Sequence, residues 1–108
     1  MGVSEVLFLP DYIIGDMVFN WSEEKAESNL RKHGVSFEEA ATAFGDAGAK
    51  IYDDEEHSDD EERFLLVGYS KFSRLLIICH CLRGRDNDIV RIISARKVNN
   101  HERQRYEN

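Results

Sequence analysis

The second half of the chain contains three apolar stretches with the period of β-strands, separated by short polar turns. They span residues 63–70, 74–83 and 89–96, and this spacing predicts an antiparallel meander. The middle stretch is apolar on both of its faces, which is typical of a central strand covered by helices. We therefore expect a sheet with residues 74–83 as an inner strand.

The last of these stretches carries a cation in its middle. Side chains alternate along a strand, which gives one face with Ile89, Arg91, Ile93 and Ala95 and another with Val90, Ile92 and Ser94. The second face is mostly apolar and should pack on the core. Burying the arginine of the first face is costly unless it is paired, so this residue is either salt-bridged or directed into a ligand groove.

The first half of the chain has the period of α-helices instead. Residues 22–33 predict a helix, because carboxylates occupy its first turn, cations occupy its last turn and Gly34 follows as a stop. Its expected apolar face consists of Ala26, Leu30 and His33, which share one side at helical spacing.

Two capping boxes mark further helices. Ser36 and Glu39 have the spacing at which each side chain bonds the backbone of the other, and they open a second helix. The apolar stripe of that helix consists of Phe37, Ala40, Ala41 and Phe44. Asn99 and Glu102 repeat the spacing ahead of a short helix at residues 101–106.

Short strands at residues 17–21 and 50–52 complete the predicted α+β fold, in which two N-terminal helices pack on a mostly antiparallel sheet and a short C-terminal helix follows. We expect a single domain at 17–108, preceded by an N-terminal extension at 1–16. The longest apolar run, 75–82, is too short to span a bilayer, and the chain start does not resemble a secretory signal. These features predict a cytoplasmic protein.

The net charge of −7 argues against a generic nucleic-acid binder, but the charges are unevenly distributed. Residues 53–62 carry eight carboxylates and no lysine or arginine. Residues 63–108 carry ten lysines and arginines against four carboxylates. The acidic segment reads as a solvated loop, whereas the basic half predicts a local site for phosphate or for an acidic partner.

Common catalytic and metal-binding motifs do not occur in the sequence. Cys79 and Cys81 flank His80 without a metal-ligand spacing, and they read as small core residues, so we expect no metal and no cofactor. The chemistry-bearing residues are instead Arg63, Arg74, Arg83, Arg91, Arg96 and Lys97, together with His33 and His57. This set is compatible with RNA cleavage, which needs a base, an acid and cations around the phosphate.

Each of these residues also has a structural interpretation. A strand arginine is more often a salt-bridged or solvated surface residue than a catalytic one. His33 can serve as a helix C-terminal cation that interacts with the helix dipole. His57 sits in an acidic loop, where a solvated imidazole among carboxylates is the simplest interpretation.

Longer strings favour the functional interpretation. KHGVSFEEA at 32–40, HSDDEERFLLVGYS at 57–70, RLLIICHCLR at 74–83 and RIISARK at 91–97 occur in the order and spacing of the BrnT toxins, which the chain resembles from about residue 17 to residue 107. The resemblance implies a RelE-like fold and a metal-independent ribonuclease that arrests growth. It also implies a BrnA-like antitoxin with a ribbon-helix-helix part that binds operator DNA, in a complex with two copies of each protein.

The resemblance also assigns roles to residues. It implies that Arg83, Arg91 and Arg96 bind phosphate and stabilise the transition state. Lys32, His57 and Tyr106 become candidates for proton transfer, and Glu61 becomes an orienting residue for Arg63. The remaining RNA-binding candidates are Arg63, Arg74 and Lys97. The alternative is a non-catalytic module, whose basic sheet docks an acidic antitoxin tail or peptide in a complex that regulates its own promoter.

Overall fold

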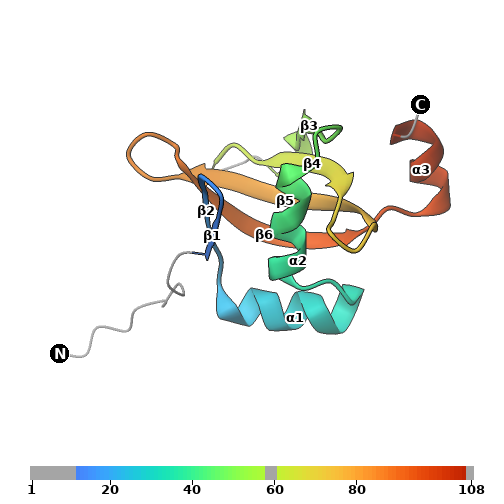
Figure 1. Cartoon of the computed structure of the whole chain (residues 1–108), viewed down its shortest axis with the longest axis horizontal. Helices are drawn as coiled ribbons and strands as arrows, with labels where there is room; N and C mark the ends of the chain where they lie inside the picture. The colour runs from blue at the N-terminus through green and yellow to red at the C-terminus, as the bar shows by residue number, and fades with distance from the viewer. Residues whose placement is uncertain (1–11, 58–60, 107–108) are drawn as a thin grey trace.

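The computed structural model describes residues 12–57 and 61–106, which form an α+β fold with a six-stranded mixed sheet and three α-helices (Figure 1). Most of the expected N-terminal extension, residues 1–11, lies outside the described residues. In chain order the elements are β1 (Tyr12–Ile14), β2 (Met17–Asn20), α1 (Glu23–His33), α2 (Phe37–Thr42), the 3₁₀ turn η1 (Ala43–Gly45), β3 (Lys50–Asp53), the 3₁₀ turn η2 (Glu55–His57), β4 (Phe64–Tyr69), β5 (Leu75–Arg83), β6 (Ile89–Lys97) and α3 (Asn100–Tyr106).

The sheet has the strand order β1-β2-β6-β5-β4-β3, and neighbouring strands are antiparallel except β2 and β6. The predicted meander is confirmed as β4, β5 and β6. β1 lies inside the segment 1–16 that we interpreted as an extension, and it pairs with β2, so the sheet reaches back to Tyr12. β2 pairs only with the first part of β6, from Ile89 to Arg91, and within the described residues the rest of that edge has no strand neighbour.

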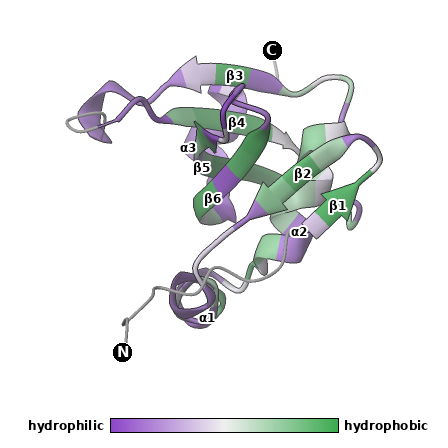
Figure 2. Ribbon diagram, turned by 90° about the vertical axis from the view of Figure 1, so that its left-hand side faces the viewer, coloured by the Kyte–Doolittle hydropathy of each residue, from purple (hydrophilic) through white to green (hydrophobic). Residues whose placement is uncertain are grey.

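α2 lies across one face of the sheet and covers the main core (Figure 1). Phe37, Ala40 and Ala41 are buried there against Leu76 and Ile78 of β5, as the predicted apolar stripe requires. Figure 2 shows β4 and β5 as mainly hydrophobic ribbons inside the sheet. The burial of apolar side chains between α2 and these strands is the main stabilising term of the fold.

α1 has the predicted ends but a different buried face. Ser22 caps its start, and Gly34 ends it in the left-handed region with φ of 68°, which favours glycine. Of the predicted apolar face, Ala26 packs half-buried against the core, but the prediction was wrong for Leu30, which is 52% exposed, and for His33, which is also exposed; the buried residue of the helix is Asn29. The helix therefore does not pack as an apolar stripe on the sheet face; it lies beside the second half of β6.

Asn29 takes the place of a strand neighbour at the edge of β6. Its Nδ2 donates to the carbonyl oxygens of Ala95 at 2.8 Å and Val35 at 3.0 Å, and its Oδ1 accepts from the Ala95 amide at 3.0 Å. Buried backbone groups need such partners, because leaving them unpaired costs the full desolvation penalty. One amide side chain thus joins α1 to the sheet.

A β-bulge interrupts the alternation of β6. Cys79 pairs with Ser94 whereas His80 pairs with Ile92, so Ile93 is an extra residue. The predicted assignment of β6 side chains to the two faces of the sheet is therefore wrong for the residues that follow Ile93. Ala95 is buried in the core together with Ile92, and Ser94 lies on the opposite face.

The two predicted capping boxes have different outcomes. Asn99 and Glu102 form a reciprocal box, in which the Asn99 amide donates to Oε1 at 3.0 Å and the Glu102 amide donates to Oδ1 at 2.8 Å. Ser36 Oγ accepts from the Glu39 amide at 3.0 Å, but the carboxylate of Glu39 binds Arg74, which lowers the pKa of Glu39. Among the described helices, none has the length and apolar character to cross a membrane.

Candidate active site on the open face of the sheet

The β-bulge brings the two arginines of β6 to the same side of the sheet. Arg91 and Arg96 are five positions apart, so they would lie on opposite faces of a regular strand. Because Ile93 is an extra residue, Arg91, Ser94 and Arg96 all face away from α2. Their register partners on β5 are Cys81, Cys79 and Ile77. We call this side of the sheet, opposite α2, the open face.

A cleft of about 400 Å³ lies on the open face between the sheet, η2 and α3. Its lining includes His33, His57, Arg63, Arg96, Glu102 and Tyr106. These side chains come from α1, from the acidic segment, from β6 and from α3, which are distant in sequence. The cleft therefore combines cations with two imidazoles, of His33 and His57, and the phenol of Tyr106, all of which can transfer protons.

Arg96 is held in the cleft by Glu102. The guanidinium donates from Nη1 to Oε1 at 2.8 Å and from Nη2 to Oε2 at 2.7 Å, which is the bidentate geometry that orients an arginine. This hydrogen bonding lowers the pKa of Glu102 to about 2 and raises the pKa of Arg96. Glu102 therefore has two structural roles: it binds Arg96 of β6, and it accepts a hydrogen bond from the Asn99 amide in the capping box of α3.

Glu102→Gln is expected to have a lower free energy of unfolding than the parent at neutral pH, and this difference should shrink as the pH falls through the acid range. The pKa of this carboxyl falls from its ordinary 4.5 to about 2 on folding. Its stabilisation is therefore fully present above pH 4.5 and is lost as the pH falls toward 2. Urea unfolding of both proteins at a series of pH values should show a stability difference that shrinks in this window. Glu38→Gln on the exposed side of α2 is the control, and a difference independent of pH would contradict the assignment.

A second groove of about 320 Å³ adjoins the cleft, because Arg63 and Ile93 line both. Glu61, Arg83 and Arg91 also line it. The carboxylate of Glu61 forms an ion pair with Arg83, and its Oε1 lies 3.6 Å from Nε of Arg63. The hydrogen bond from Arg83 is the largest cause that lowers the pKa of Glu61, and it raises the pKa of Arg83 in turn. The cleft and the groove form one continuous surface.

The family described as "Ribonuclease toxin, BrnT, of type II toxin-antitoxin system" matches residues 21–102, which is most of the chain. The chain belongs to the BrnT family of ribonuclease toxins. The resemblance in the sequence motifs is thereby confirmed, and the family implies an RNA target and an antitoxin partner. No protein of curated function matches this BrnT family member.

The predicted site residues of this BrnT toxin fall into two groups. Those that line the cleft or the groove are His57, Glu61, Arg63, Arg83, Arg91, Arg96 and Tyr106. Lys32 and Lys97 are exposed at the ends of α1 and β6 and do not line either one. Arg74 lies on the helical side, where its Nε donates to Glu39 at 2.8 Å and its Nη2 donates to the Gly34 carbonyl at 3.0 Å.

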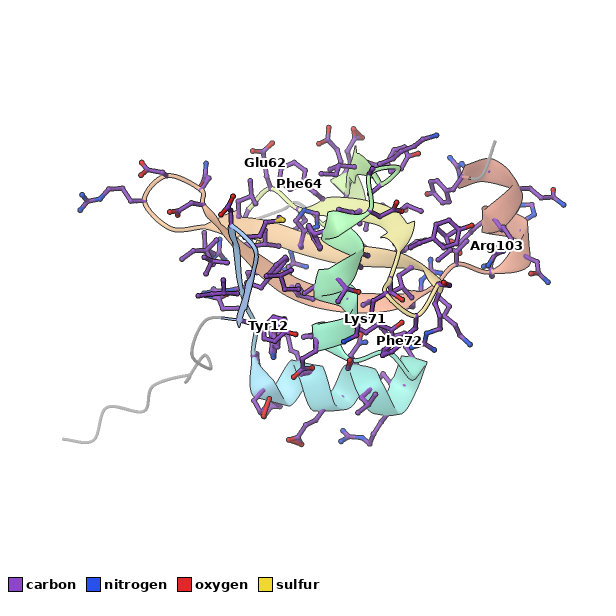
Figure 3. The ribbon with its side chains drawn as sticks, viewed as in Figure 1. Tyr12, Glu62, Phe64, Lys71, Phe72 and Arg103 are labelled. Carbon is purple, nitrogen blue, oxygen red and sulfur yellow. The ribbon has the colours of Figure 1, made fainter. Side chains whose placement is uncertain are left out.

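Acidic residues border the site of this BrnT toxin more closely than the sequence indicated. Glu56 lines the cleft, Glu61 lines the groove, and Glu62 lies just before β4 (Figure 3). Lys71 and Phe72 lie in the turn that follows β4, toward the helices (Figure 3). Carboxylates thus neutralise part of the positive charge of the open face: Glu61 pairs with Arg83, and Glu102 pairs with Arg96.

Sequence reasoning missed three contacts of the site. Asn20 accepts from Arg91 Nε at 3.0 Å, which follows from the parallel pairing of β2 with β6 and could not be read from local pattern. Asp54 binds His57, and the spacing of three residues could have indicated this contact. Cys79 contacts Asp54 across the sheet. In the described part of the chain, no group of three or more histidine, cysteine or acidic side chains is placed to hold a metal ion.

Proposed function

We propose that this chain is a metal-independent endoribonuclease toxin with a RelE-like fold, which cleaves RNA on its open face and thereby arrests growth. The observation that carries the proposal is the convergence on that face of four arginines, an imidazole and a phenol: Arg63, Arg83, Arg91, Arg96, His57 and Tyr106. Arginine forks bind phosphate oxygens in pairs and stabilise the charge that develops on them during cleavage.

The proposed reaction uses the 2′-hydroxyl of the RNA as the nucleophile. His57 takes its proton, the oxygen attacks the adjacent phosphorus, and the bond to the 5′-oxygen breaks. The leaving oxygen receives a proton from Tyr106, which lines the same cleft as His57. Arg96 binds the phosphate between them, while Arg83 and Arg91 bind the strand along the groove. Lys32 is a weaker candidate for proton transfer because it lies outside the cleft.

We further propose that a BrnA-like antitoxin neutralises this toxin in a complex with two copies of each protein. Its ribbon-helix-helix part would contact operator DNA, so that the toxin reaches DNA only through the antitoxin. The type II family supports an antitoxin as partner. The arginines of the open face are complementary to an acidic segment of such a partner.

One observation favours a second function, a non-catalytic module that binds the antitoxin or an acidic peptide in promoter autoregulation. Glu61 and Glu102 already form ion pairs with Arg63, Arg83 and Arg96. A phosphate must displace or share these carboxylates, whereas a protein partner can bind around them. The two functions differ in chemistry, so RNA cleavage separates them.

The purified chain, freed of antitoxin, is expected to cleave single-stranded RNA in the presence of excess EDTA. Arg91→Ala should lower kcat/KM about tenfold, which is the contribution of one charge-assisted hydrogen bond to phosphate. The rate of fragment formation on a denaturing gel measures the cleavage by the parent and by the variant. Expression of the parent chain in a bacterium should arrest growth in parallel.

Arg85→Ala is the matched control, because Arg85 is exposed in the turn between β5 and β6 and its loss changes the charge equally. Intact RNA together with tight binding of the antitoxin would exclude the nuclease and establish the binding module. Cleavage that disappears on chelation and returns with a divalent cation would contradict the metal-independent mechanism.

A further inference from the structure

Of the two imidazoles that line the cleft, that of His57 is held by a buried carboxylate. Nδ1 of His57 lies 3.0 Å from both carboxylate oxygens of Asp54. The side chain of Asp54 is 8% exposed, whereas that of His57 is 60% exposed and lines the cleft. The carboxylate therefore lies behind the ring, and the ring reaches from it toward the space where RNA is proposed to bind.

Local backbone structure fixes this pair. The Asp54 amide donates to the Arg63 carbonyl at 2.9 Å, which extends the pairing of β3 with β4 by one residue. The next three residues form η2, and the His57 amide donates to the Asp54 carbonyl at 3.2 Å. In a 3₁₀ turn, side chains three positions apart are superposed, so the two side chains meet.

A buried thiol supports the carboxylate from the sheet. Cys79 lies in the middle of β5 on the open face, and its Sγ is 3.5 Å from Oδ2 of Asp54. Burial raises the pKa of this thiol to about 12, so the sulfur keeps its proton and acts as a donor. The carboxylate of Asp54 thus accepts hydrogen bonds from two sides, one from the strand and one from the imidazole.

These contacts determine which nitrogen of the imidazole carries the proton. A carboxylate can only accept, so in the neutral ring Nδ1 is the protonated nitrogen and Nε2 keeps its lone pair. Nε2 is the atom that is left to accept a proton from a group in the cleft. The positive charge that then forms on His57 is next to the carboxylate of Asp54, which stabilises it.

We infer that Asp54 and Cys79 are positioning residues for RNA cleavage: Asp54 holds His57 in the Nδ1-protonated form with Nε2 directed to the 2′-hydroxyl, and Cys79 holds the carboxylate of Asp54. The inference rests on the proposed ribonuclease function. It assigns to the acidic segment a role beyond that of a solvated loop, because one of its carboxylates, that of Asp54, is buried behind the imidazole.

The test measures the tautomer of His57 and the cleavage kinetics on the same proteins. Long-range proton–nitrogen NMR of the histidine-labelled chain reports which ring nitrogen is protonated, and His57→Gln assigns the signal among the four histidines. The parent is expected to carry the proton on Nδ1. Asp54→Asn should shift the ring toward the Nε2-protonated form and lower kcat about a hundredfold, with KM changed less than about threefold.

Two matched sets of variants separate positioning from folding. Glu55→Gln removes an equal charge from the same turn at an exposed position, and it should keep the tautomer and kcat of the parent. Cys79→Ala removes the donor and should lower kcat several-fold, whereas Cys79→Ser retains a donor and should recover most of the rate. Thermal unfolding checks that each variant is folded.

An Nε2-protonated ring in the parent would overturn the inference without any variant. A kcat of Asp54→Asn equal to that of the parent would also overturn it. Absence of RNA cleavage by the parent would instead refute the proposed function, and the NMR signal would still report whether Asp54 orients the ring. The failure of the inference and the failure of the proposed function are therefore distinguishable.

Discussion

Arg96→Ala is expected to lower the kcat of RNA cleavage by about 10²- to 10³-fold, which is the usual effect of removing one donor to developing negative charge. Arg96 lies in the same cleft as His57 and Tyr106, and Glu102 holds its guanidinium in a bidentate geometry. Single-turnover cleavage of a short RNA measures the effect. Arg96→Lys should restore little, because an ammonium group does not offer the paired donors of a guanidinium.

The Arg96 variant needs a control for charge and one for folding. Arg85→Ala loses the same charge from an exposed turn and should cleave RNA at the rate of the parent. Because Glu102 loses its partner in Arg96→Ala, the free energy of unfolding of both variants should be measured by urea titration. A folded Arg96→Ala protein with the kcat of the parent would show that the reaction occurs elsewhere.

Asn29→Ala is expected to lower the free energy of unfolding by about 3 kcal/mol, the largest stability effect that we predict for a single residue. The substitution removes three hydrogen bonds and leaves the amide and carbonyl of Ala95 and the carbonyl of Val35 without their partner. Urea or thermal unfolding of the purified protein measures the loss.

Leu30→Ala is the matched comparison, since it changes the neighbouring residue on the same helix. Leu30 is 52% exposed, so this substitution should lower the free energy of unfolding by less than about 1 kcal/mol. A larger loss for Leu30 than for Asn29 would indicate that α1 packs through its apolar residues, as helical periodicity alone predicts. The comparison thus tests the placement of α1 directly.

Local signals in the sequence were sufficient to predict most secondary structure. The caps at Ser36 and Asn99 and the stop at Gly34 predicted helix ends, because these groups satisfy backbone atoms that lie within a few residues. The apolar run at residues 74–83, bounded by two polar turns, predicted β5 as an inner strand. β1 was not predicted, because its pairing with β2 adds a strand inside a segment that reads as an extension.

The errors have a common physical cause, which is that they depend on contacts between distant residues. Ile93 became an extra residue through the register of β6 against β5, and strict alternation cannot detect such a shift. Asn29 is buried because the edge of β6 needs hydrogen-bond partners, whereas helical periodicity ranks the residue as polar and exposed. Tertiary hydrogen bonding outweighed the local pattern in both cases.

The candidate site was predicted in composition more than in arrangement. Motif resemblance grouped Arg83, Arg91 and Arg96, and all three lie on the open face. It also grouped Arg74 and Lys97 with them, but both lie away from the cleft and the groove. Glu61 and Glu102 form ion pairs with arginines of other elements, and such contacts depend on the three-dimensional fold. From the sequence alone, Glu61 could be predicted only as an orienting residue and Glu102 only as part of a capping box.

The edge of β6 beside α1 has a consequence for assembly. Exposed strand edges are templates for strand addition and for aggregation, and proteins protect them by covering their free amides and carbonyls. The side chain of Asn29 occupies the donor and the acceptor of Ala95 at this edge. Among the strands of residues 12–57 and 61–106, β1 and β3 are the outermost, so a partner chain that joins this sheet as an additional strand is expected to pair with one of them, at opposite ends of the sheet.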